Sequence, residues 1–243
     1  PDPANPARYA HLEPATKALQ ARGLAVQGEL YVTIFETAWS IRGFEQMLTD
    51  LVLHPDFAEV LFERLTALRV VEAQQMARAG VDVLRLGDDV ASQAGMLMSP
   101  AVWRTWLKPR LARIIEAAKA IKPDIHIFYH SDGNCQAIVP DLIEIGVQIL
   151  NPVHVRAKGM EPVALKRDFG DALVFWGGGV DTQAVLPSGT PREVKDDVRR
   201  NIEALAPGGG FVFSSVHNIQ ADVPPQNIIA MWEALQEYGV QYA

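Results

Sequence analysis

One unit recurs along this chain: a helical segment ends at a glycine, and a short apolar run follows it. The glycine is Gly80 before VDVLRL, Gly146 before VQIL and Gly170 before DALVFW. A glycine just past a helix supplies the left-handed conformation that ends it. A short run that is apolar at nearly every position is typical of a strand buried on both faces. The repeated unit therefore predicts alternating helices and strands, and with them a parallel sheet.

Six strands are expected, with helices between them. Thr190-Pro191 marks one helix start, because a hydroxyl before a proline caps the first turn, and Glu193 stands at capping-box spacing from Thr190. No low-complexity linker divides the 243 residues, so we expect a single domain over 1–243. The expected strands lie near 25–31, 82–86, 125–130, 147–150, 172–176 and 211–214.

Parallel strands joined by helices occur in open sheets and in closed barrels. An open nucleotide-binding sheet carries G-x-G-x-x-G after a strand, which neither GGGVD at 177–181 nor PGGG at 207–210 matches. Each expected strand ends in polar residues, and six such ends suit a ring better than a crevice. We therefore expect an α/β fold of the (β/α)8 TIM barrel type. Because that barrel has eight strands, about six βα units are expected here, with the first two upstream of Pro1.

The polar strand ends are the candidate site, because this end of the strands carries the site in parallel α/β folds. Structural alternatives stay open. The carboxylates of Asp88 and Asp89 either bind a cationic group or a metal, or one of them caps the short turn before SQAG. The rings of Trp39 and Tyr129 either pack on a flat ligand or belong to the core. The strand-end residues are Glu36, Asp88, Asp89, Gln93, His130, Asp132, Asn151, His154, Asp181, Gln183 and His217.

Charge and cysteine content narrow the classes of partner. The net charge is −7 and no dense lysine or arginine patch occurs, which argues against nucleic acid as a partner. No apolar run is long enough to predict a membrane-spanning helix. The single cysteine, Cys135, excludes an internal disulfide and fits a reducing cytoplasm. An anionic small molecule remains compatible with this composition.

Five segments follow one another in a distinctive order: GDDVASQAGMLMSP, FYHSDGN, LIEIGVQILNPV, FGDALVFWGGGVDTQAVLPSGTPREV and APGGGFVFSSVHNIQADVPPQNIIA. In order and spacing they resemble the uroporphyrinogen decarboxylase superfamily, from about residue 28 to the C-terminus. The resemblance implies a (β/α)8 barrel whose arginine-rich first strand lies upstream of Pro1, and a homodimer. It implies one of two activities: decarboxylation without a cofactor, or zinc-dependent methyl transfer to or from a corrinoid or a thiol.

The metal-using relatives carry His-x-Cys after the fifth strand and a further cysteine after the eighth. At the matching positions this chain has His130-Ser131-Asp132 and His217, so the thiolate ligands are absent. His130, Asp132 and His217, with a carboxylate such as Glu36, could instead form a nitrogen and oxygen site for zinc. The alternative is that His130 and Asp132 hydrogen-bond loop amides.

The leading expectation is cofactor-free decarboxylation of tetrapyrrole acetate side chains, with His217, His130 and Asp132 as catalytic residues. Tyr129 and Trp39 are expected to line the cleft. One alternative is a metal-dependent methyltransferase or demethylase that works with a corrinoid protein. Another is a barrel that binds a tetrapyrrole or corrinoid without chemistry. The remaining expected substrate contacts are Glu36, Asp88, Asp89, Gln93, Asn151, Asp181 and Gln183.

Overall fold

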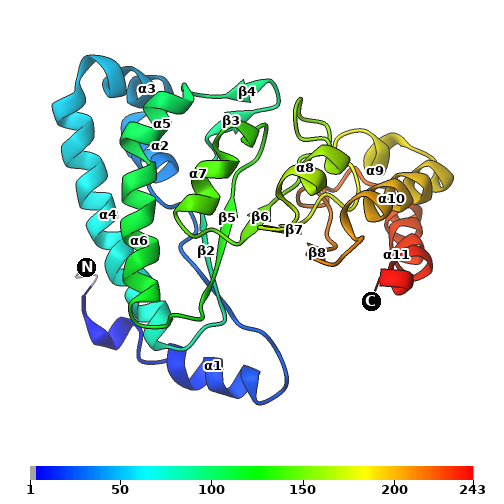
Figure 1. Ribbon diagram of the computed structural model, residues 1–243, viewed down its shortest axis with the longest axis horizontal. Helices are drawn as coiled ribbons and strands as arrows, with labels where there is room; N and C mark the ends of the chain where they lie inside the picture. The colour runs from blue at the N-terminus through cyan, green and yellow to red at the C-terminus, as the bar shows by residue number, and fades with distance from the viewer. Residues whose placement is uncertain (1–3, 243) are drawn as a thin grey trace. The chain divides into compact units, whose positions relative to one another are not determined.

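The structure, a computed structural model, describes residues 4–242, and the chain divides into two units (Figure 1). Unit 1 takes in the chain up to Val90, together with Met96–Ser131 and Ala137–Gln148. Unit 2 takes in Ala91–Gly95, Asp132–Gln136 and the chain from Ile149 onward.

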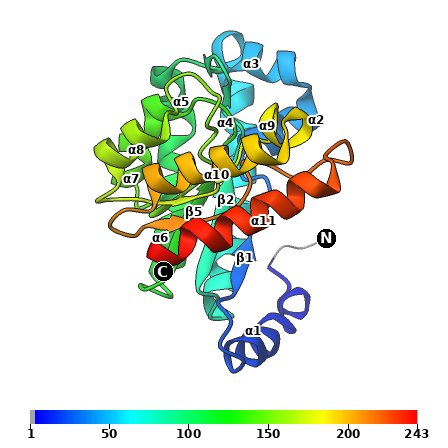
Figure 2. The same ribbon diagram turned by 90° about the vertical axis from the view of Figure 1, so that its right-hand side faces the viewer.

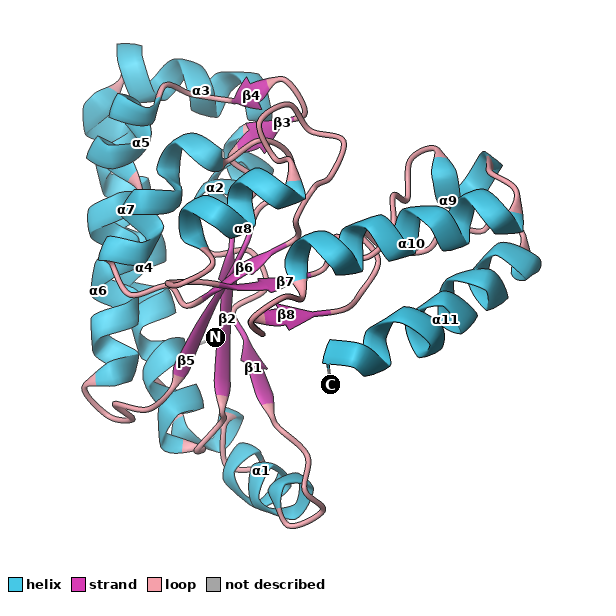
Figure 3. Ribbon diagram, turned by 45° about the vertical axis from the view of Figure 1, so that its right-hand side comes forward, coloured by secondary structure: helices cyan, strands magenta, loops and turns pink. Residues whose placement is uncertain are grey.

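Unit 1 is built on three parallel strands in the order β1 (Gln27–Glu29), β2 (Val83–Gly87) and β5 (His126–His130). Figure 3 shows them in magenta, with their C-terminal ends on one side. Leu84 lies opposite Ile127 in the register, and both are fully buried. The apolar runs of the sequence are therefore strands with both faces covered.

The helices of unit 1 pack beside these strands. The 24-residue α4 (Pro55–Arg78) lies along α6 (Lys108–Lys119), as Figures 1 and 3 show. Phe62 on α4 and Leu111 on α6 are both fully buried, and burial of such large apolar side chains is the main force that holds packed helices together. The other helices are η1 (Pro6–Arg8), α1 (Leu12–Gln20), α2 (Phe35–Arg42), α3 (Phe44–Leu53), α5 (Pro100–Trp106) and α7 (Val139–Glu144), which follows η2 (Gln136–Ile138).

Unit 2 repeats the alternation with β6 (Ile149–Asn151), β7 (Val174–Trp176) and β8 (Phe211–Val212), which are parallel and adjacent in that order. Two long helices, α10 (Pro191–Leu205) and α11 (Pro225–Gly239), lie side by side (Figure 2). Their shared core includes Val194, Val198 and Ala230. The shorter elements are α8 (Pro162–Phe169), α9 (Val185–Ser188) and η3 (Val240–Tyr242).

The six strands predicted from the sequence are the six parallel strands of the structure, each lying within or next to its expected range. The sequence did not predict β3 (Ala91–Ser92) and β4 (Gly95–Met96), which form a small sheet of their own. The fold is α/β, with helices between successive parallel strands, and it is the arrangement of a TIM barrel with about six of its eight βα units.

The helix ends confirm most of the glycine pattern. Gly80 and Gly146 have φ of 79° and 97°, the left-handed conformation expected of them. Gly170 is different, because its φ is −64°. The chain leaves α8 through a further turn, in which the N–H groups of Ala172 and Leu173 both donate to the Phe169 carbonyl. No left-handed residue is therefore needed at Gly170.

Within residues 4–242, no helix combines the length and apolar character that a membrane crossing needs.

Candidate functional site

Asp88, directly after β2, is fully buried and acts as a helix cap. Its carboxylate accepts the N–H of Ile34 at 3.1 and 3.0 Å and the N–H of Glu36 at 2.9 Å. These amides belong to the start of α2, where backbone donors have no partner within the helix. Asp88 thus caps α2, a helix more than 50 positions earlier in the chain, and not the short turn before SQAG for which the sequence offered it, and it lies away from any accessible surface.

The ionisation of Asp88 reflects this environment. Burial removes water from the charged form and raises the pKa of Asp88 from 3.8 to about 7. The amide hydrogen bonds from Glu36 and Ile34 oppose the rise, and the nearby negative charge of Glu36 adds to it. Asp88 is therefore a buried carboxyl group whose charge state changes near neutral pH.

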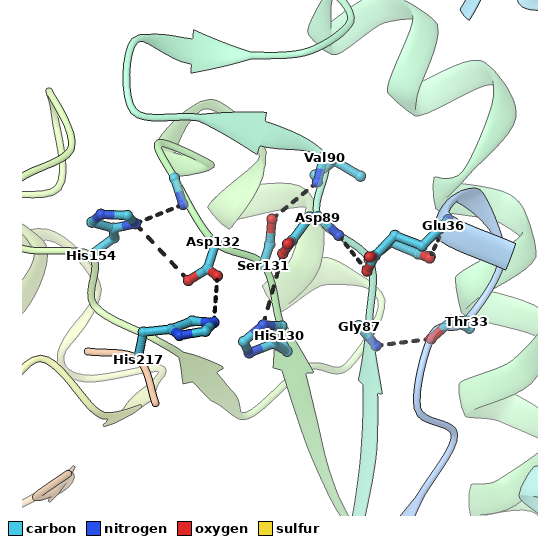
Figure 4. Close-up of polar contacts among 12 residues, drawn as sticks. Thr33, Glu36, Gly87, Asp89, Val90, His130, Ser131, Asp132, His154 and His217 are labelled. Atoms are coloured by element: carbon cyan, nitrogen blue, oxygen red, sulfur yellow. Dashed lines mark hydrogen bonds and ion pairs between the residues drawn. The ribbon is translucent and has the colours of Figure 1, made fainter. Parts of the chain in front are cut away.

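Three partly exposed residues of unit 1, Glu36, Asp89 and His130, lie in a row (Figure 4). The Oε2 of Glu36 accepts the N–H of Asp89 at 2.9 Å, and the Oδ1 of Asp89 lies 3.8 Å from Nε2 of His130. Gly87 permits this approach, because a Cβ there would lie 2.7 Å from the Cβ of His130. The predicted residues Glu36, Asp89 and His130 are thus brought together at the ends of β2 and β5.

The loop before α2 is fixed by two residues to which the sequence assigned no role. The Thr33 hydroxyl accepts the N–H of Gly87 at 2.8 Å. Arg69, on α4, donates to the carbonyl oxygens of Thr33 and Val32 at 2.9 and 2.7 Å. An arginine on an otherwise amphipathic helix gives no signal of such a contact, because its partners are backbone atoms of a distant loop.

In unit 2 the carboxylate of Asp132 faces His217, with 3.5 Å between Oδ2 and Nε2 (Figure 4). Asp132 is mostly covered, whereas about half of the His217 side chain is exposed. Both border a cavity of about 220 Å³. Its lining is rich in hydrogen-bonding groups: Asp132, His154, Thr182, Gln183, Val216, His217, Asn218 and Gln220.

His154, in the loop after β6, joins this group from the other side of Asp132. Its Nδ1 accepts the N–H of Gly133 at 3.0 Å and lies 4.0 Å from Oδ1 of Asp132. Its Nε2 lies 3.2 Å from Oε1 of Gln183. The sequence marks His154 as a polar strand end but gave it no role. A histidine directly after NPV, three residues past the end of a strand, is the signal that could have assigned one.

Asp181 is buried, and its carboxylate holds the loop that follows it through hydrogen bonds. Its Oδ1 accepts the N–H of Gln183 at 2.8 Å, and its Oδ2 accepts the N–H of Val185 at 3.2 Å and a guanidinium N–H of Arg156 at 3.3 Å. Asn151 has a similar part, since its side-chain amide donates to the Trp176 carbonyl at 2.7 Å and bridges β6 and β7. We therefore place Asp181 and Asn151 in the framework of the site.

The three glycines at 177–179 lie close to other loops of unit 2. A Cβ at Gly178 would lie 2.7 Å from the Cβ of Val153, and a Cβ at Gly179 would lie 2.4 Å from the ring of Phe213. Gly177 and Gly178 also have φ of 94° and 84°, left-handed conformations that favour glycine where the chain turns. The glycines admit the protein's own side chains.

The remaining predicted contacts are Tyr129 and Trp39 in unit 1 and Gln93 in unit 2. Tyr129 is fully buried in β5, so its ring does not line an accessible cleft as expected, because both faces of this strand are covered. Trp39 packs edge-on against Phe44, with ring centroids 5.8 Å apart. Gln93 is exposed in the turn between β3 and β4, and its carbonyl accepts the N–H of Lys158. These positions give no support to a shared aromatic wall.

Comparison with known proteins identifies relatives of two activities. The family model "Uroporphyrinogen decarboxylase (URO-D)" matches residues 31–238. A uroporphyrinogen decarboxylase from Anaeromyxobacter dehalogenans (strain 2CP-C) is 24% identical over 220 residues, which is 88% of this chain and 58% of that protein. The methylcobamide:CoM methyltransferase MtaA from Methanosarcina barkeri is 28% identical over 186 residues, which is 75% of this chain and 50% of that protein.

Among solved structures, a methyltransferase from Methanosarcina mazei superimposes with a TM-score of 0.71 at 22% sequence identity. The match covers 94% of this chain and 64% of that one. This likeness supports the fold described above. The chain spans about half the length of the curated relatives that it matches.

Proposed function

Because the chain belongs to the uroporphyrinogen decarboxylase family, we propose that it is part of a carboxy-lyase that removes CO₂ from acetate side chains of a tetrapyrrole. The proposal includes a cytoplasmic location, a homodimer and chemistry without a cofactor. Relatives that are decarboxylases and relatives that are methyltransferases both support an enzyme. The choice of decarboxylation depends on the arrangement of donors and acceptors in unit 2.

The observation that carries the proposal is the pair formed by Asp132 and His217 at the edge of a polar cavity. The Asp132 carboxylate, 3.5 Å from Nε2, fixes the place of the His217 ring at the cavity edge. A protonated histidine can hold a substrate carboxylate or transfer a proton to carbon. The amide and hydroxyl groups of Gln183, Asn218 and Thr182 line the same cavity and can orient a polar substrate.

The proposed reaction balances with acid–base groups alone. A proton added to a pyrrole carbon makes the ring an electron acceptor. The bond between the acetate methylene and its carboxylate then breaks, the electron pair moves into the ring, and CO₂ leaves. A proton delivered to the methylene makes a methyl group, and the ring loses the first proton. Net consumption is one proton for each CO₂ released. In this proposal His217 transfers protons and Asp132 orients its ring.

The test is the release of CO₂ and of the methylated product from uroporphyrinogen by the full-length protein without added cofactor. His217→Gln is expected to lower kcat by about 100-fold or more, the usual contribution of a proton-transferring group. His11→Gln is the matched control, since His11 is an exposed residue next to α1, and it should leave kcat unchanged. Absence of CO₂ release by the unmodified protein would refute the proposal.

Metal-dependent methyl transfer is the second candidate, favoured by the relative named methylcobamide:CoM methyltransferase. The donor set fits such an ion in part: His217 and Asp132 offer nitrogen and oxygen ligands of the kind that zinc binds. His154 does not add a ligand through Nδ1, because that atom accepts the Gly133 N–H. A zinc ion held here would supply Lewis-acid activation of the methyl acceptor. His130 remains the third predicted ligand.

Metal analysis separates this candidate from the first. Under methyl transfer, the purified full-length protein carries about one zinc per chain, and both His217→Gln and His130→Ala lose it, whereas His11→Gln retains it. Transfer of a methyl group between a corrinoid protein and a thiol should then depend on zinc. Binding of a tetrapyrrole or corrinoid with neither CO₂ release nor methyl transfer would instead support the non-catalytic alternative.

A further inference from the structure

His154 is a buried imidazole with a partner at each ring nitrogen. It is 8% exposed and lies in the loop after β6. On one side Nδ1 meets the N–H of Gly133, and on the other Nε2 meets the side-chain oxygen of Gln183. Because the two partners belong to separate loops, His154 connects the loop after β5 to the loop after β7.

The partners determine which nitrogen carries the proton. A backbone N–H is only a donor, so Nδ1 must offer its lone pair to Gly133 and cannot itself be protonated. The proton of the neutral ring is then on Nε2, which donates to Oε1 of Gln183 at 3.2 Å. The 4.0 Å approach of Nδ1 to Oδ1 of Asp132 is consequently a contact between a neutral ring and a carboxylate, and not an ion pair.

The turn that receives this hydrogen bond has little freedom. Gly133 has a φ of 83°, and a Cβ there would lie 2.6 Å from the Ser92 carbonyl oxygen. The next residue, Asn134, donates its N–H to that same oxygen at 2.8 Å. The turn is therefore packed against β3 on one side and held by His154 at the amide that directly follows Asp132.

We propose that His154, as the neutral ring protonated on Nε2, is a positioning residue that fixes Asp132 opposite His217 by accepting the Gly133 N–H. Gln183 holds the ring in this tautomer from the edge of the cavity. The inference rests on the proposed role of the Asp132–His217 pair, but the hydrogen-bond arrangement behind it can be tested without any activity.

The first measurement is the NMR spectrum of full-length protein labelled with ¹⁵N-histidine at neutral pH. We expect His154 to show an unprotonated, pyridine-type Nδ1 and a protonated, pyrrole-type Nε2, with the signals assigned by their loss in His154→Gln. A pyrrole-type Nδ1, or a doubly protonated ring, would overturn the inference. Neither outcome depends on the identity of the substrate. The NMR measurement therefore tests the inference even if the protein has no carboxy-lyase activity.

The second measurement compares two replacements of the ring. In His154→Asn the side-chain Oδ1 takes the place of Nδ1 and can still accept the Gly133 N–H, so kcat should stay within about 3-fold of the unmodified enzyme. His154→Leu fills the space but leaves that buried N–H without an acceptor, so we expect kcat to fall by about 10-fold to 100-fold with little change in KM. We also expect the His217 ring signals to move in His154→Leu but not in His154→Asn.

Stability measurements distinguish positioning from loss of folding. Equal loss of kcat in both variants, or unmoved His217 signals in His154→Leu, would overturn the inference. If His154→Leu does not fold, Gln183→Leu serves instead, because Gln183 is exposed, its replacement removes the acceptor for Nε2, and the ring signal that is measured needs no substrate. The Nε2 signal of His154 should then shift while the protein stays folded, and an unmoved signal would contradict the assigned contact.

Discussion

Asp88 and Asp89 are neighbours with opposite surroundings. Successive side chains at a strand end point to opposite faces, so Asp88 turns into the interior and caps α2, while Asp89 stays partly exposed beside His130. The sequence predicts that two carboxylates stand at this strand end. It does not reveal which of them points inward, because that depends on the register of β2 against β1 and β5.

Asp88→Asn tests the cap. The amide keeps one oxygen acceptor but turns an NH₂ group toward a backbone N–H, and a buried donor without an acceptor costs about 1–3 kcal/mol. We expect the free energy of unfolding in urea to fall by about that amount. Asp89→Asn is the matched control and should change it by less than about 0.5 kcal/mol, since Asp89 is partly exposed. Equal effects of the two substitutions would contradict the cap.

The pKa of Asp88 predicts a pH dependence of a definite sign. The folded pKa is about 7 and the ordinary value is 3.8, so the folded state holds a proton that the unfolded chain has lost between about pH 4 and pH 7. Stability falls with pH wherever the folded state binds more protons. Asp88 should therefore contribute a decrease in unfolding free energy from pH 4 to pH 7, and Asp88→Asn should lack this contribution. Parallel curves for the two proteins over that range would contradict the raised pKa.

At the scale of elements, local signals account for what the sequence predicted. The strands are apolar runs bounded by glycine, and the start of α10 is marked by a threonine, a proline and a glutamate. β3 and β4 were missed because two residues are too few to show a period. The prediction for Gly170 was wrong because a helix can also end by continuing into a right-handed turn, which the sequence does not mark.

The capping box of α10 is the element whose energy is easiest to measure. The Thr190 hydroxyl accepts the N–H of Glu193 at 3.3 Å, and Oε2 of Glu193 accepts the N–H of Thr190 at 2.7 Å. Thr190→Ala should lower the free energy of unfolding by about 1 kcal/mol. Thr105→Ala is the control: Thr105 is exposed within α5, and alanine there should be neutral or slightly stabilising. A neutral Thr190→Ala would show that the box adds nothing in solution.

At the scale of the whole molecule, the sequence predicts the order of the strands along the chain. It does not predict which side chains contact one another at each site. His130, Asp132 and His217 were predicted from their places at strand ends. The contacts of His154 with Gly133 and Gln183 join residues 21 and 29 positions apart. Arg69 reaches Thr33 from 36 positions away. No local pattern encodes such contacts, because they arise only when several loops fold together.

The packing of the loops in unit 2 can be tested with a matched pair of glycines. Gly178 and Gly208 both have left-handed φ, 84° and 78°, so alanine is strained at either position by about 1–2 kcal/mol. Nothing lies within 4 Å of a Cβ at Gly208, whereas a Cβ at Gly178 would lie 2.7 Å from that of Val153. Gly178→Ala must therefore also push apart the loops that carry His154 and Gln183. We expect it to lower the free energy of unfolding by about 3 kcal/mol or more.

The same pair distinguishes the effect on the site from the effect on folding. Gly208→Ala should lower the free energy of unfolding only by the cost of its left-handed backbone, and it should leave the ¹⁵N signals of His154 unchanged. In Gly178→Ala the displaced loop should lengthen the contact between Nε2 of His154 and Gln183, so the Nε2 signal should move even at temperatures where the protein remains folded. If both variants lose the same stability and keep the same His154 signals, the glycines at 177–179 serve the turn of the chain alone, and the close packing on Val153 does not position the site.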